Sequence, residues 1–153
     1  MRMCAPHREL VERVAQNLRA SDCAEVFAAE RRSGYEGAIA AWRDSDICQA
    51  IIGDQGEAVG LCGVNGHYIW MLGTDELTAT ASHRLQLARG ARRWIAAVVQ
   101  HKLETTGQCL LHNWVCARNL ESVRWLKSLG FEMSQPEPFG HSLQLFHHFR
   151  MVR

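Results

Sequence analysis

The first third of the chain has apolar positions at the spacing of amphipathic helices. Pro6 suits the first turn of the first predicted helix. Asp22 and Glu25 form a pair typical of a helix start, and Gly34 separates the second predicted helix from the third. The apolar positions of these three helices are Leu10, Val11, Val14, Leu18, Val26, Phe27, Tyr35, Ile39 and Trp42.

From Ile47 onward the pattern changes to short apolar runs that predict strands. Two such runs flank the turn sequence Asp-Gln-Gly-Glu at 54–57, which favours a hairpin. A third run covers 67–72, and glycines separate all three. A polar link over 74–82 leads to a long helix. The predicted apolar stripe of that helix is Leu85, Ala88, Ala91, Ile95, Val98 and Leu103.

The last third of the chain begins after Gly107 with the strand-like sequence CLLHNWVCA at 109–117. Residues 119–129 predict a helix with Asn119 as its N-cap. We expect Gly130 to follow this helix with a positive φ, as is common one residue beyond a helix end. The predicted apolar stripe of the helix is Leu120, Val123, Leu126 and Leu129.

Two strands complete the predicted order of elements. One starts at Phe131, where Pro136 and Pro138 limit its pairing, and the other covers 142–151. The order is therefore helices, three strands, helix, strand, helix and two strands. Helices between strands imply crossover connections and layered α/β (α+β) packing. No repeat, low-complexity segment or linker interrupts the order, so we expect a single domain over 1–153.

Charge and apolar content argue against two classes of partner. The formal net charge is +1, so the chain as a whole has no electrostatic attraction to nucleic acid. No apolar run approaches the roughly 20 residues that span a bilayer, and the first ten residues lack the apolar centre of a signal peptide. We therefore expect no nucleic-acid or membrane partner and a cytoplasmic location.

The cysteines and histidines do not predict a metal site. The six cysteines are scattered without a C-x-x-C pair, so zinc is not expected and all six should be free thiols in a reducing compartment. His147 and His148 are adjacent in a predicted strand, where neighbouring side chains face opposite sides. A metal ion shared by these two histidines is therefore not expected.

The helix that begins at Asn119 resembles the last conserved segment of the GNAT family of acetyl-CoA-dependent N-acetyltransferases. Asn119, the small Ser122, and Gly130 with Phe131 match that segment, whereas Leu126 stands where the family often has a tyrosine. The resemblance implies the GNAT fold. This fold has a mostly antiparallel, mixed and twisted sheet flanked by helices on both faces.

A narrower resemblance spans most of the chain. The sequence is similar to a small group of GNAT-like phage proteins related to the minor internal virion protein of short-tailed phages. It implies a protein in the cytoplasm of an infected bacterial host or packaged in the virion. The matching segments are NLRASDCAEV at 17–26, WMLGTDEL at 70–77, RRW at 92–94, NWVCARN at 113–119, VRWLKSLGF at 123–131 and PEPFG at 136–140.

The GNAT resemblance also implies an acetyl-CoA site. In these enzymes a loop Gln/Arg-x-x-Gly-x-Gly/Ala precedes a helix whose N-terminus binds the pyrophosphate. The nearest segment here is QLARGA at 86–91, in which Arg89 replaces the first glycine and offers a guanidinium to phosphate. The alternative is a helix that begins near Ser82 and places Gly90 in its interior. The residues expected at the cofactor are Met71, Leu72, Gln86, Arg89, Gly90, Ala91, Arg92 and Asn119.

Amine acetylation needs a base for the ammonium proton and an acid for the leaving thiolate. Glu76 is the predicted base, although an acidic pair with Asp75 at a helix start is the plainer interpretation. Asn119 is expected to cap its helix and, by the resemblance, to lie near the pantetheine arm of the cofactor. Leu126 cannot be the acid, which leaves water. His112 faces either the groove or a helix-covered layer.

Two functions remain open at this point. The leading hypothesis is a phage-encoded GNAT-like protein that binds acetyl-CoA and acetylates an amine on a host or virion protein. The alternative is a catalytically degenerate GNAT-fold protein that acts as an internal virion component or binds a host factor. Arg89 in place of glycine, Leu126 in place of tyrosine and the long link over 74–82 favour the alternative. A homodimer through an exposed final strand is a further expectation.

Overall fold

The computed structural model describes residues 1–153. The order of its elements agrees with the predicted one and adds a short first strand, a 3-10 turn and a short strand near the C-terminus. The elements are β1 (Arg2–Cys4), α1 (Arg8–Gln16), α2 (Ala20–Glu30), α3 (Gly34–Asp44), β2 (Ile47–Ile52), β3 (Ala58–Asn65), β4 (Tyr68–Gly73), η1 (Asp75–Thr78), α4 (Ala81–Thr106), β5 (Leu110–Cys116), α5 (Leu120–Ser128), β6 (Glu132–Met133), β7 (Glu137–Phe139) and β8 (Gln144–Val152).

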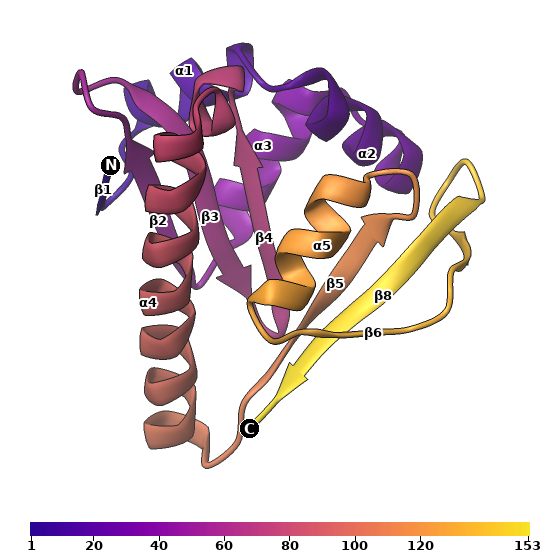
Figure 1. The fold of residues 1–153 in the computed structure, drawn as a ribbon. Coiled ribbons are helices and arrows are strands. Elements are labelled where there is room, and N and C mark those ends of the chain that lie inside the picture. Colours follow the sequence, from indigo (N-terminus) through magenta and orange to yellow (C-terminus); the bar gives the residue numbers. More distant parts are fainter.

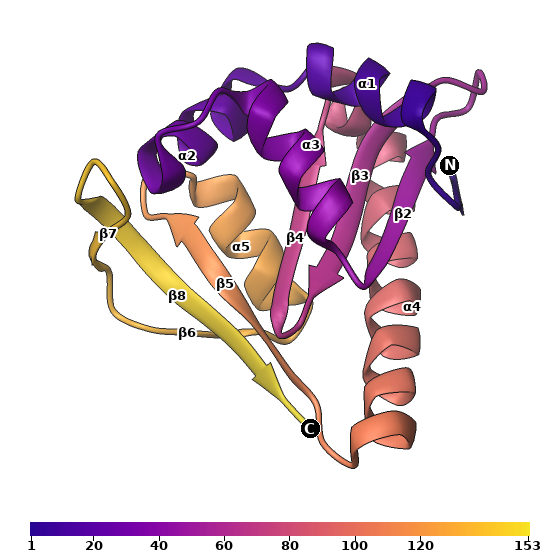
Figure 2. The ribbon, with the colours of Figure 1, turned by 180° about the vertical axis from the view of Figure 1, so that it is seen from behind.

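One sheet contains all eight strands. Their order is β1-β2-β3-β4-β5-β8-β6, and β7 pairs with β8. Only β4 and β5 run parallel; every other pair is antiparallel. Helices α4 and α5 cover one face of the sheet (Figure 1), and α1, α2 and α3 cover the other (Figure 2). The predicted fold class, a mostly antiparallel mixed sheet with helices on both faces, is confirmed.

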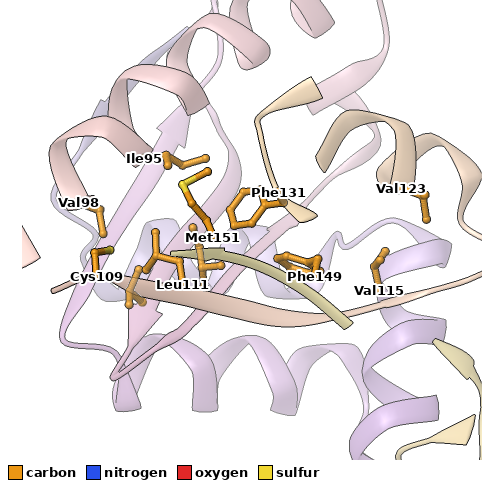
Figure 3. Close-up of a cluster of buried hydrophobic side chains, with 11 residues drawn as sticks. Ile95, Val98, Cys109, Leu111, Val115, Val123, Phe131, Phe149 and Met151 are labelled. Carbon is orange, nitrogen blue, oxygen red and sulfur yellow. The ribbon is translucent and has the colours of Figure 1, made fainter. Parts of the chain in front are cut away.

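The largest hydrophobic core lies between the sheet and the helices α4 and α5 (Figure 3). Ile95 of α4 and Val123 of α5 belong to it, together with Met151 of β8. The rings of Phe131 and Phe149 meet edge to face there, 5.2 Å between centroids. A second cluster packs α1 against β2 and β3 on the opposite face. Burial of apolar side chains on both faces thus fixes the helices to the sheet.

Both ends of α5 form as the sequence predicts. The Asn119 side chain accepts a hydrogen bond from the N–H of Ser122 at 3.2 Å, which makes it the N-cap. Gly130 has a φ of 94°. The N–H groups of Gly130 and Phe131 return to carbonyls in the last turn of the helix at 3.0 and 3.2 Å. This pair of bonds is the Schellman motif, which requires the left-handed conformation that glycine adopts freely.

Four predicted helix faces need correction. The exposed residues are Phe27 of α2, Tyr35 of α3, Leu85 and Leu103 of α4, and Leu120 of α5. Leu120 is the first residue of α5 and projects beyond the core. In α4 the predicted positions Ala91, Ile95 and Val98 are buried, but Leu87 takes the place expected for Leu85. Since both leucines continue a helical spacing, the sequence pattern alone does not choose between them.

The final strand is not available to a second copy of the chain in the way the sequence suggests. Strand β5 pairs with one edge of β8, while β6 and β7 pair with the other. The expectation of an exposed final strand is therefore wrong, because the segment after α5 folds back along β8. The edge strands of the sheet are β1 on one side and the short β6 and β7 on the other.

The six cysteines are free thiols, as predicted. Cys62, Cys109 and Cys116 are buried, and burial raises the pKa of Cys48 to about 11. These side chains therefore act as small apolar residues. None of the helices combines the length and the apolar content needed to cross a membrane.

Candidate functional site

Strands β4 and β5 form a fork. They pair at Tyr68 and His112 only and then diverge (Figure 1). Asn113 fills the branch point: its Nδ2 donates to the carbonyl of Ile69 at 2.9 Å, and its Oδ1 accepts from the N–H of Trp114 at 2.8 Å. A side-chain amide thus occupies the place of the next backbone pair. Beyond it the two strands present open edges to each other.

The far end of β4 is closed by the start of α2. The carbonyl of Gly73 accepts from the N–H of Arg19 at 2.9 Å, and the N–H of Gly73 donates to Asp22 Oδ2 at 2.8 Å. Alternate residues of a strand direct their N–H and C=O to the same edge, so those of Met71 also face β5. No residue of β5 pairs with Met71. The fork therefore exposes the backbone donor and acceptor of this residue.

Asp22 is a buried carboxylate inside α2 and not the helix cap that the sequence suggests. The residue at the N-cap position is Arg19, whose guanidinium pairs with Asp22 at 3.0 Å. Burial raises the pKa of Asp22, against the opposing effects of Arg19 and of the Gly73 N–H. The bonds of Arg19 and Asp22 to the backbone of Gly73 tie the start of α2 to the end of β4. Asp22 is therefore a satisfied structural group.

Glu25, one turn further along α2, reaches the open side of the fork. Its Oε1 accepts from Asn119 Nδ2 at 2.9 Å and from the N–H of Cys116 at 3.3 Å. Its Oε2 has no hydrogen-bond partner in the chain, and no cation pairs with it. Burial raises the pKa of Glu25, and the hydrogen bond from Asn119 lowers it less. A half-buried carboxylate with one free oxygen and a raised pKa suits a proton acceptor.

Two cavities meet at Met71. The first, here called the aromatic chamber, has a volume of about 190 Å³ and lies against α2 and α3. The second, here called the polar chamber, has a volume of about 410 Å³ and lies beside the first turns of α4 and α5. The aromatic chamber is lined by Glu25, Trp70, Trp114, Phe139 and Phe146, among others. Residues common to both chambers are Arg19, Met71, Ser122 and Trp125.

The first turn of α4 borders the polar chamber. Thr80 caps this helix, because its hydroxyl accepts from the N–H of His83 at 3.1 Å. The N–H groups of Ala81 and Ser82 have no partner within the helix. Arg84 lines the chamber, and its guanidinium donates to a carbonyl of η1 at 2.9 Å. A helix N-terminus beside a guanidinium favours bound anions.

Three of the predicted cofactor residues lie at the fork. Met71 and Leu72 line the aromatic chamber, and Asn119 lines the polar chamber. The expected phosphate loop at 86–91 is wrong, because α4 already begins at Ala81 and these residues are helical. The alternative start near residue 82 describes the helix correctly.

The remaining predicted cofactor residues point elsewhere. Gln86 Oε1 accepts from the N-terminal ammonium group, on the side of α4 next to β1. Arg89 is exposed and forms no hydrogen bond within the chain, and Gly90 lies in the helix interior. Ala91 is buried, and Arg92 donates to a carbonyl at the end of α5 at 3.3 Å. A hollow of about 590 Å³ beside Arg92 contains none of the groups at the fork.

Glu76, the predicted base, is exposed on η1 and lines neither chamber. A hydrogen bond with Thr74 lowers its pKa, which is the opposite of what a base near neutral pH needs. His112 lies on the sheet face away from α4 and α5. There its ring lies tilted against that of Tyr68, 4.5 Å between ring centroids, and contacts His148 at 3.1 Å. Burial and then His148 lower the pKa of His112.

Sequence reasoning missed Glu25 as a site residue. A signal was present: Asp22 and Glu25 are three residues apart, which places both carboxylates on one face of a helix rich in alanine. No signal in the sequence identifies Asn119 as the residue with which Glu25 pairs. Glu25 and Asn119 are 94 residues apart in the chain, and only the packing of α2 beside the start of α5 brings them together.

Comparison with protein-family models gives no match, and comparison with curated protein sequences gives none either. Solved structures do match. Spermidine N-acetyltransferase from Vibrio cholerae, in complex with CoA and spermine, has a TM-score of 0.64 and 10% identity, covering 99% of this chain and 94% of its own. Apo YjaB from Escherichia coli has a TM-score of 0.53 and 12% identity, covering 99% and 95%.

A mutant form of the Vibrio cholerae enzyme SpeG matches over a shorter stretch, with a TM-score of 0.50 and 12% identity. That match covers 69% of this chain and 63% of the length of SpeG. At these identities the similarity is one of fold. The chain has the GNAT fold, as the helix at Asn119 predicts.

Proposed function

We propose that this protein is an acetyl-CoA-dependent N-acetyltransferase. The observation behind the proposal is the fork, where the open backbone of Met71 lies between the polar chamber and the free oxygen of Glu25. A thioester bound along this open edge would meet an amine held beside Glu25. The shared fold with a spermidine N-acetyltransferase solved with CoA and spermine supports the proposal.

The polar chamber fits the phosphates of acetyl-CoA better than the segment 86–91 does. Arg84 lines this chamber at the end of the first turn of α4, the turn in which the N–H groups of Ala81 and Ser82 have no partner within the helix. Arg89 lies more than one turn further along α4 and lines neither chamber. We therefore assign the phosphate contacts to the first turn of α4 and to Arg84.

Three groups at the fork have separate roles in the proposed reaction: Glu25, the N–H of Met71, and Asn119. Bound acetyl-CoA supplies the electrophilic carbonyl carbon of its thioester. Glu25 takes a proton from the acceptor ammonium group, and the neutral nitrogen forms a bond to that carbon. The N–H of Met71 donates to the carbonyl oxygen as negative charge develops on it. Asn119 holds Glu25 Oε1 and so directs Oε2 toward the amine.

The bond between carbon and sulfur breaks last, and the thiolate leaves. Leu126 lines the aromatic chamber and has no proton to give. A thiol has a pKa of about 8.5, so its thiolate is a tolerable leaving group that water can protonate. In this proposal the base is Glu25 and not Glu76, and no side-chain acid is required.

Two measurements test the proposal. Calorimetric titration with acetyl-CoA should give a dissociation constant near micromolar, equivalent to roughly −8 kcal/mol. Release of CoA thiol should require both an amine and Glu25. Glu25→Gln keeps the two bonds to Oε1 and should bind acetyl-CoA like the wild type, while acetyl transfer falls at least about a hundredfold. Absence of binding at millimolar acetyl-CoA would refute the function.

One observation favours the alternative of a non-catalytic protein. The chain has neither a glycine loop before α4 nor a tyrosine at Leu126. The GNAT shape would then serve as a binding surface in a phage particle or on a host factor, as the narrower sequence resemblance implies. This alternative predicts no binding of CoA, and a protein partner that requires the exposed Arg89 and Arg93. The location in an infected bacterium or a virion stays a prediction from that resemblance.

A further inference from the structure

The aromatic chamber offers one free carboxylate oxygen. Its acidic lining residues are Asp22, Glu25 and Glu30. Asp22 is paired with Arg19 at 3.0 Å. Glu30 lies at the surface, half exposed, and pairs with Arg32 at 3.3 Å. Glu25 is therefore the one shielded carboxylate of the chamber with an oxygen free to bind, which favours one ammonium group over a row of them.

Aromatic rings form much of the remaining wall. Trp114 and Phe139 are stacked, with 4.2 Å between ring centroids and 11° between planes. Phe146 meets Phe139 edge to face at 5.5 Å, and Trp70 lines the chamber from β4. Such rings attract other aromatic groups in stacked or edge-to-face arrangements. The part of an acceptor beyond its ammonium group would therefore contact aromatic carbon.

The turn between β7 and β8 fixes this wall against α2, beside which it lies in both views (Figure 1 and Figure 2). Gly140, with a φ of 72°, approaches α2 so closely that an added Cβ would lie 2.6 Å from the Cα of Ala29. The N–H groups of His141 and Ser142 donate to carbonyls of α2 at 3.0 Å each. Phe139, next to Gly140, is thereby held over the chamber, which limits the length of a ligand.

The size of the chamber further restricts the class of ligand that it can bind. Its volume is about 190 Å³. An apolar protein cavity of about 150 Å³ holds one benzene molecule. The chamber therefore has room for one aromatic ring and a short link to an amine. Pockets for larger ligands measure roughly 300 Å³ or more. An extended polyamine or a peptide segment would reach beyond this volume.

Resting on the acetyltransferase function proposed above, we infer that the acceptor is a small primary monoamine with an aromatic body, of the benzylamine or phenethylamine class. Its ammonium group lies at Glu25 Oε2, and its ring packs against Trp114 and Phe139. A polyamine is a poor substrate, because no second shielded carboxylate is free to pair with another ammonium group desolvated in the chamber.

A rate comparison tests this inference. CoA-thiol release is measured with benzylamine, phenethylamine, spermidine and lysine at fixed acetyl-CoA. We expect kcat/KM for the aromatic amines to exceed that for spermidine at least about tenfold. Phe139→Leu should raise the KM for benzylamine about threefold to tenfold, since one aromatic contact is lost. The matched control is Tyr35→Leu, which changes an exposed aromatic residue of α3 outside the chamber and should leave KM unchanged.

A binding measurement without acetyl-CoA gives a second readout. Trp70, Trp114 and Trp125 line the chamber, so benzylamine should change the tryptophan fluorescence and spermidine should not. Glu25→Gln should abolish that response without lowering the melting temperature.

The outcomes separate the acceptor class from the proposed function. Binding of acetyl-CoA with preferred acetylation of spermidine or lysine overturns the acceptor class and leaves the function standing. Binding of acetyl-CoA with no response to benzylamine in either readout also overturns it. A fluorescence response to benzylamine that needs Glu25, together with no binding of acetyl-CoA, supports the amine site and refutes the function.

Discussion

Glu25 is the residue at which function and stability conflict. Burial raises its pKa above the ordinary value of 4.5, so the folded state holds this proton more tightly than the unfolded state. Between 4.5 and the raised value the folded state therefore binds more protons, and stability falls as the pH rises through that window. Above the raised pKa the loss is complete. The charged form of Glu25 thus destabilises the fold.

Glu25→Gln should accordingly make the protein more stable at pH 7 while acetyl transfer is lost. The gain should shrink as the pH falls toward 4.5, because protonation of the wild-type carboxyl group removes the cost of burying its charge. Urea unfolding followed at pH 7 and pH 4.5 measures both effects. Glu30→Gln, at an exposed position of the same helix, is the control and should stay within about 0.5 kcal/mol of the wild type. A Gln variant less stable than the wild type at pH 7 contradicts the assignment.

Gly90 is a helix-interior glycine with no steric reason to be one. A Cβ at this position would meet nothing closer than the Cε of Met3 at 3.7 Å. Gly90→Ala should therefore stabilise the protein by up to about 1 kcal/mol, the usual difference in helix propensity. Gly140→Ala is the contrasting variant and should destabilise, because its Cβ would overlap the backbone of Ala29. Urea unfolding measures the stability of both variants. No gain in stability from Gly90→Ala would contradict the open space that the structure shows around this position.

At the scale of elements, local signals determined what the sequence could predict. The two ends of α5 follow from Asn119 and Gly130, whose hydrogen bonds form within a few residues of each side chain. The start of α4 likewise depends on a local signal, because the side chain of Thr80 caps the helix. The letters of QLARGA at 86–91 match a phosphate loop by composition, but they lie in the second and third turns of the helix. The cap at Thr80 marks the helix start, which the motif places too late.

The start of α4 makes a testable distinction between two arginines of one helix. Arg84→Ala should weaken the binding of CoA about tenfold to a hundredfold, because one charge-assisted bond to phosphate is lost. Arg89→Ala is the matched control, an exposed arginine outside both chambers, and should bind CoA like the wild type. Calorimetry with CoA measures both variants. The reverse result would return the phosphate site to the segment 86–91.

At the scale of the whole molecule, the candidate site depends on contacts that local signals do not specify. Met71 and Asn119 could be predicted because they lie in segments with a recognisable pattern. Glu25 joins Asn119 across 94 residues, and Phe139 is placed by the docking of Gly140 on α2. The open edge at Met71 exists because β4 and β5 pair at one position only. Register and the absence of pairing are properties of the assembled sheet, so sequence patterns give no direct sign of them.

The sheet has two halves, β1 to β4 and β5 to β8, and the fork joins them. The joint consists of the pair Tyr68–His112 and the side-chain amide of Asn113. The amide both bridges the halves and keeps the next residues apart. It therefore contributes to stability and to the opening in which the reaction would occur.

Asn113→Ala should affect both properties. The variant removes two hydrogen bonds and leaves the carbonyl of Ile69 and the N–H of Trp114 unpaired, which should cost about 1–3 kcal/mol. Acetyl transfer should fall as well, because the edge at Met71 is no longer held at a fixed opening. Urea unfolding and CoA-thiol release measure the two effects, with the exposed Asn65→Ala as control. A loss below about 0.5 kcal/mol would mean that the helices packed across the fork, and not the amide, hold the halves together.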